Sequence, residues 1–81
     1  MRIVDLRSDT VTLPTDEMLK AIVNARLGDD QYCEDPTVAE LQEKAATKLG
    51  KEDALLVISG TQANLVSVMS QTNPGDKIIL E

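Results

Sequence analysis

The stretch Ala54-Leu55-Leu56-Val57-Ile58-Ser59-Gly60-Thr61-Gln62-Ala63-Asn64-Leu65 decides the fold, because an apolar run ends there in small polar residues that open a new helical pattern. Five consecutive apolar residues are typical of a strand that is buried on both faces of a parallel sheet. A second segment expected to form a strand, residues 77–80, follows the helix and an Asn-Pro-Gly-Asp turn. The sequence therefore predicts an α/β fold with a strand-helix-strand unit of a mainly parallel sheet.

The turn between this strand and this helix is suited to bind an anion. The first N–H groups of a helix have no partner within the helix, and the helix dipole is positive at that end. Gly60 has no Cβ to block a ligand, and Ser59 or Thr61 offers a hydroxyl donor. Phosphate is the natural occupant of such a turn. The alternative is an ordinary strand-to-helix connection in which Ser or Thr only caps the helix.

Composition excludes several classes of function. The 81 residues carry a formal net charge of −6, which disfavours binding to nucleic acid. No apolar stretch reaches the roughly 20 residues needed to cross a bilayer, so we expect a cytoplasmic protein with no membrane partner. The chain has one cysteine, Cys33, and no histidine, which rules out an intrachain disulfide and a Cys/His zinc site made from this chain alone. No metal ligand is assigned.

The remaining elements follow from caps and periodicity. Asp35 and Pro36 are typical of an N-cap followed by the first helical residue, and Gly28 and Gly50 are expected to end two of the helices. The expected helices cover residues 15–27, 36–49 and 61–72. We expect a single partial unit over residues 1–81, in which residues 1–50 form an N-terminal arm with two helices and residues 51–81 begin a larger domain.

Two polar segments flank the first of these helices. Residues 5–12 are rich in Asp, Ser and Thr, which either brace a loop or line a site. Residues 28–36 hold four acids and the only aromatic residue, Tyr32. The acids lack the spacing of a calcium loop, so solvated turn residues are the simpler interpretation. Tyr32 either contacts a planar ligand or anchors its own loop.

Three motifs together resemble one family: Asp5-Leu6-Arg7-Ser8-Asp9-Thr10-Val11-Thr12, Gly28-Asp29-Asp30-Gln31-Tyr32-Cys33-Glu34-Asp35-Pro36-Thr37-Val38, and Ser59-Gly60-Thr61-Gln62-Ala63-Asn64. They resemble the N-terminal part of the low-specificity L-threonine aldolases, pyridoxal-phosphate enzymes of the aspartate-aminotransferase fold type (fold type I). The resemblance covers essentially the whole chain. It departs from the family at Cys33, where the family usually has Gly, which puts the local turn geometry in question.

The resemblance implies an N-terminal fragment of a lyase that cleaves L-threonine or L-allo-threonine to glycine and acetaldehyde. The backbone amides of Gly60, Thr61 and Gln62, with the Thr61 hydroxyl, would bind the phosphate of pyridoxal 5'-phosphate. Ser8 and Tyr32 would contact the substrate. A homotetramer, or a homodimer, is implied for the full-length protein.

No catalytic residue is assigned within these 81 residues, because no lysine of the chain lies in a context that matches the family's cofactor-binding lysine. Two alternatives remain open. One is another β-eliminating lyase of the same superfamily, and the other is a phosphate-binding fragment without catalytic activity.

Overall fold

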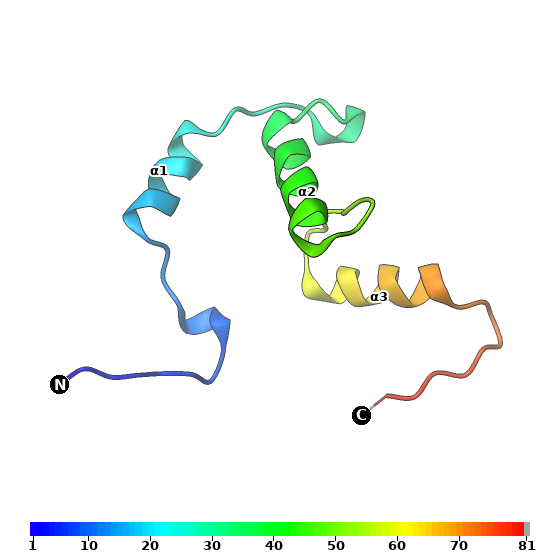
Figure 1. Ribbon diagram of the computed structural model, residues 1–81. Helices are drawn as coiled ribbons and strands as arrows, with labels where there is room; N and C mark the ends of the chain where they lie inside the picture. Colours follow the sequence, from blue (N-terminus) through cyan, green and yellow to red (C-terminus); the bar gives the residue numbers. More distant parts are fainter. Residues whose placement is uncertain (81) are drawn as a thin grey trace. The chain divides into compact units, whose positions relative to one another are not determined.

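The computed structural model describes residues 1–80. The chain divides into two compact units, Met1–Thr37 and Val38–Glu81, and each is described by itself. Figure 1 shows the helical elements along the chain. In order, they are η1 (Asp9–Val11), α1 (Asp16–Asn24), η2 (Asp30–Tyr32), α2 (Pro36–Leu49) and α3 (Gly60–Gln71).

The start of α1 confirms the cap predicted from the sequence, whereas its end does not. The Thr15 hydroxyl accepts a hydrogen bond from the backbone N–H of Met18 at 3.3 Å. The helix was expected to run to residue 27 and to end at Gly28, but it ends at Asn24, and Ala25 is already extended. The Asn24 side chain donates to the carbonyl of Lys20 at 2.9 Å. The backbone N–H of Ala25 bonds the carbonyl of Ile22 at 3.4 Å, which satisfies one of the carbonyls that the end of the helix leaves open.

Both ends of α2 confirm the sequence prediction. Asp35 Oδ1 accepts from the backbone N–H of Thr37 at 2.9 Å, which is the geometry of an N-cap. At the other end Gly50 has φ of 64°. The N–H of Lys51 bonds the carbonyl of Ala46, and the N–H of Gly50 bonds the carbonyl of Thr47. This pair of bonds is the Schellman motif, which explains why the helix stops at a glycine.

The two expected strands are not formed within residues 1–80, and the prediction of a strand-helix-strand unit is not confirmed. Residues 54–58 and 77–80 belong to no helix and make no ladder (Figure 1). The backbone N–H of Leu56 instead bonds the side-chain oxygen of Gln42 on α2 at 2.9 Å. A strand is defined by hydrogen bonds to a neighbouring strand, and these residues have none to pair with.

Little of the chain is buried. Ala46 on α2, with 7% of its surface exposed, is the buried hydrophobic residue among those described. Large apolar side chains on all three α-helices are exposed, including Ile22, Leu41 and Leu65.

In residues 1–80, no helix has the length and apolar character to span a membrane.

Candidate functional site

The start of α3 is built by two side chains that cap it. Ser59 is extended, with φ of −157°, and its hydroxyl oxygen accepts from the backbone N–H of Gln62 at 3.1 Å. The side-chain oxygen of Gln62 accepts from the backbone N–H of Ile58 at 2.9 Å. This reciprocal pair resembles a capping box, in which the residue three positions into the helix reaches back to the segment before it. It fixes the angle between residues 54–58 and the helix.

The capping bonds leave two amides of this turn open. The N–H of Gln62 is engaged by Ser59, and that of Ala63 by the carbonyl of Ser59 at 3.0 Å. No hydrogen bond described in residues 1–80 uses the N–H of Gly60 or of Thr61. A Cβ added at Gly60 would meet no atom within 4 Å, so the space beside these amides is open. An anion with several acceptor oxygens fits this corner.

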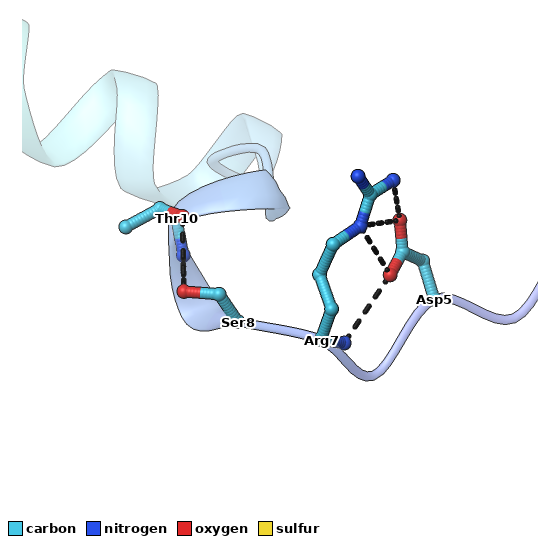
Figure 2. Close-up of polar contacts among 4 residues, drawn as sticks. All are labelled: Asp5, Arg7, Ser8 and Thr10. Atoms are coloured by element: carbon cyan, nitrogen blue, oxygen red, sulfur yellow. Dashed lines mark hydrogen bonds and ion pairs between the residues drawn. The ribbon is translucent and has the colours of Figure 1, made fainter.

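The N-terminal arm holds an ion pair. The Nε of Arg7 donates to both carboxylate oxygens of Asp5, at 3.0 and 2.9 Å, and Nη2 also bonds Oδ2 (Figure 2). The Arg7 side chain, and then its backbone N–H, lower the pKa of the Asp5 carboxyl, and the same contact raises the pKa of Arg7. Both side chains lie at the surface, so we assign this pair a local orienting role and no large share of stability.

Ser8 lies directly after this pair and caps η1. Its hydroxyl oxygen accepts from the backbone N–H of Thr10 at 3.2 Å and from the Thr10 hydroxyl at 2.9 Å (Figure 2). Its own proton is directed to Asp9 Oδ1 at 3.4 Å. The Ser8 side chain is therefore ordered by its neighbours and exposed.

The segment that carries Tyr32 is closed by a group of contacts that we call the loop clasp, made by Arg26, Gly28, Asp35 and Thr37. Asp35 Oδ2 accepts from the backbone N–H of Gly28 at 3.3 Å, and the Thr37 hydroxyl donates to the carbonyl of Arg26 at 2.6 Å. A Cβ at Gly28 would lie 2.1 Å from the carbonyl oxygen of Glu34, so only glycine fits.

Inside the loop, Tyr32 ends η2 and is 69% exposed. Cys33 follows it in the left-handed conformation, with φ of 58°. Asp29 Oδ1 accepts from the N–H of Gln31 at 2.9 Å, and the Asp29 carbonyl accepts from the N–H of Glu34 at 3.0 Å. The carboxylates of Asp29 and Asp35 thus act as caps. In the described part of the chain no group of three or more His, Cys, Asp or Glu side chains is placed to hold a metal ion.

The structure brings only some of the residues expected in the site together. Gly60, Thr61 and Gln62 form one helix start, whereas Ser8 and Tyr32 belong to the other unit. Sequence reasoning missed the loop clasp, although Asp35 was recognised as a cap. The sequence signal for the clasp is Gly28, which lies seven residues before the N-cap residue Asp35. This spacing is too common in sequences to predict the contact.

The family of the chain is shown by comparison with known proteins. The model of the beta-eliminating lyase family matches residues 5–81. The chain belongs to this family.

Among individual relatives, the chain is 53% identical over 81 residues to low-specificity L-threonine aldolase 1 of Arabidopsis thaliana, covering 99% of this chain and 23% of that protein. It is 51% identical over 77 residues to the low specificity L-threonine aldolase of Escherichia coli K12, covering 95% of this chain and 23% of the relative. The enzyme of the same name from Saccharomyces cerevisiae is 44% identical over 64 residues, which are 79% of this chain and 16% of the yeast protein. The chain thus spans less than a quarter of the length of these relatives. No solved structure matches it significantly.

Proposed function

We propose that the complete protein is a pyridoxal-phosphate-dependent lyase that cleaves L-threonine or L-allo-threonine to glycine and acetaldehyde. Membership in the beta-eliminating lyase family supports a lyase. Two relatives named low-specificity L-threonine aldolase, one from a bacterium and one from a plant, are 51% and 53% identical to this chain. Their names favour threonine as the substrate over the substrates of other lyases of the superfamily.

The observation that carries the proposal is the open corner at the start of α3. The amides of Gly60 and Thr61 have no described partner, and the space beside Gly60 is open. The residues present therefore fit the phosphate of pyridoxal 5'-phosphate, which Gly60 and Thr61 would hold through backbone N–H groups and the Thr61 hydroxyl. Gln62 contributes mainly by fixing the turn, because its N–H and its side-chain oxygen are both used in the cap.

Bound in this corner, pyridoxal phosphate would supply an electron-withdrawing ring that weakens the bonds to the α-carbon of the amino acid. The part of these residues is to bind and to orient. Gly60 and Thr61 would hold the charged end of the cofactor, Ser8 would donate a hydrogen bond to the substrate carboxylate, and Tyr32 would reach the substrate from its loop. Holding the Cα–Cβ bond in one orientation favours its cleavage over that of its neighbours.

We also infer that the complete protein acts in the cytoplasm as a homotetramer or homodimer. Tyr32 is 69% exposed on a loop that is closed by its own contacts, so its side chain would be available to a second subunit. The acidic net charge of this chain fits a small amino acid as the partner rather than nucleic acid.

The phosphate role is tested with Thr61→Ala in the complete protein. Hydrogen bonds to a charged group contribute about 1.5–3 kcal/mol, so we expect the dissociation constant for pyridoxal phosphate to rise about tenfold or more. Titration of the apoprotein with the cofactor, followed by visible absorbance, measures it. Thr47→Ala on the exposed side of α2 is the matched control and should leave the constant unchanged. A dissociation constant for Thr61→Ala equal to that of the unsubstituted protein would refute the phosphate role.

A further inference from the structure

The hydroxyl of Ser8 has both of its acceptor positions filled by one residue. A serine hydroxyl offers one proton and two lone pairs. The backbone N–H of Thr10 donates to the Ser8 oxygen at 3.2 Å, and the Thr10 hydroxyl donates to the same oxygen at 2.9 Å (Figure 2). With both lone pairs occupied, the Ser8 side chain can act toward a ligand only as a donor.

The remaining proton of Ser8 already faces a carboxylate. It is directed to Asp9 Oδ1 at 3.4 Å, which is longer than the 2.5–3.0 Å usual for an O–H···O hydrogen bond. A weak bond of this kind costs little to exchange for a better one. The carboxylate of an incoming amino acid can therefore take the place of Asp9 as the acceptor.

The charge of the neighbouring Arg7 is paired with an acid of the same segment. Arg7 is held by Asp5 through its Nε and Nη2, and its side chain is folded back onto that carboxylate (Figure 2). Of the two hydroxyl groups in residues 5–10, that of Thr10 donates at 2.9 Å, whereas the Ser8 donor is held only weakly, at 3.4 Å. Ser8 is therefore the hydroxyl of this segment whose proton is available to a carboxylate ligand.

We propose that Thr10 is a positioning residue for substrate binding: its hydroxyl holds the Ser8 oxygen so that the Ser8 proton is presented to the carboxylate of the amino-acid substrate. This inference rests on the proposed function, in which Ser8 contacts that carboxylate. Without the Thr10 hydroxyl, one lone pair of Ser8 is released, and the side chain can rotate or accept as well as donate.

The experiment uses the complete, cofactor-loaded protein with the variants Thr10→Val, Thr10→Ser, Ser8→Ala and the double variant Ser8→Ala/Thr10→Val. Valine keeps the branched shape of threonine without the hydroxyl, and serine keeps the hydroxyl. Because a net hydrogen bond is worth about 1 kcal/mol, KM for L-threonine should rise about three- to tenfold in Thr10→Val and at least as much in Ser8→Ala, with kcat little changed. Thr10→Ser should stay within about twofold of the unsubstituted protein.

The double variant tests whether Thr10 acts through Ser8. If it does, KM of the double variant equals that of Ser8→Ala, because the two effects are not independent. If the increase in KM of the double variant is the product of the increases in the two single variants, Thr10 acts independently of Ser8 and the proposal is overturned. An unchanged KM in Thr10→Val beside a raised KM in Ser8→Ala would overturn it while leaving the role of Ser8 intact. An unchanged KM in Ser8→Ala would remove the proposed substrate contact and the inference together.

A binding measurement separates positioning from a general loss of structure. Glycine and glycinamide are titrated calorimetrically into the cofactor-loaded proteins, since glycinamide lacks the carboxylate charge. Thr10→Val should weaken binding of glycine by the larger factor, because hydrogen bonds to a charged group are the stronger ones. Equal weakening of both ligands would overturn the proposal. Thr10→Ala provides the same comparison if Thr10→Val folds poorly.

Discussion

At the scale of single residues, Cys33 shows a conflict between side chain and backbone. Within residues 1–80 it is the non-glycine residue with a positive φ, 58°, and its thiol is exposed. The left-handed conformation costs a non-glycine residue roughly 1–2 kcal/mol, because Cβ crowds the following carbonyl oxygen. The sequence marked this position as a departure from the glycine usual in the family, and the structure shows that the turn keeps the glycine-like geometry.

We therefore expect Cys33→Gly to stabilise the complete protein. The gain is reduced by the greater freedom of glycine in the unfolded chain, which leaves about 0.5–1 kcal/mol. Urea unfolding measures it. Cys33→Ala is the matched control: it removes the thiol but keeps Cβ, so its stability should not change. If the alanine variant gained as much as the glycine variant, the thiol rather than the backbone would be responsible.

At the scale of elements, those defined by local signals could be predicted from the sequence. The caps at Thr15 and Asp35 and the left-handed Gly50 depend on residues within a few positions, and all three are confirmed. The end of α1 was predicted wrongly because the apolar periodicity continues to Ala25. The loop clasp uses the carbonyl of Arg26 for a hydrogen bond eleven residues away, which no local pattern indicates.

The clasp makes Gly28 a sensitive position. A methyl group there would lie 2.1 Å from the Glu34 carbonyl oxygen and 2.9 Å from the Asp35 Cα, both backbone atoms that cannot rotate away. Gly28→Ala must therefore shift residues 34–35 and weaken the bond from the Gly28 N–H to Asp35. We expect a loss of about 1–3 kcal/mol, as for other overpacked sites.

Chemical unfolding of the apoprotein measures this loss. Gly60→Ala serves as its control, because an added Cβ at Gly60 meets nothing within 4 Å in this chain. A Gly28→Ala variant as stable as the unsubstituted protein would show that the clasp is looser than the structure indicates.

At the scale of the whole molecule, the strands and the site depend on residues that are distant in the sequence: a strand needs a neighbouring strand, and the site needs residues from both units. The apolar run 54–58 leads into the open corner at the start of α3, and the cap on α3 fixes that corner. A sheet requires neighbouring strands, and residues 1–80 supply no ladder for this one. The sequence also identified Ser8, Tyr32 and Gly60 as candidate site residues. Ser8 and Tyr32 belong to one unit and Gly60 to the other, so the distances between them are not defined.

This leads to a prediction for a polypeptide of residues 1–81 alone. Its α-helices have 9, 14 and 12 residues, and isolated helices shorter than about 12–15 residues are marginal in water. Tertiary packing normally stabilises such helices, but Ala46 is the buried hydrophobic residue in the described part of the chain. We expect weak helical circular dichroism and a gradual loss of signal on heating, whereas the complete protein should unfold cooperatively. A sharp unfolding transition of the short polypeptide would show that its exposed apolar faces find partners within this sequence or in a second copy of it.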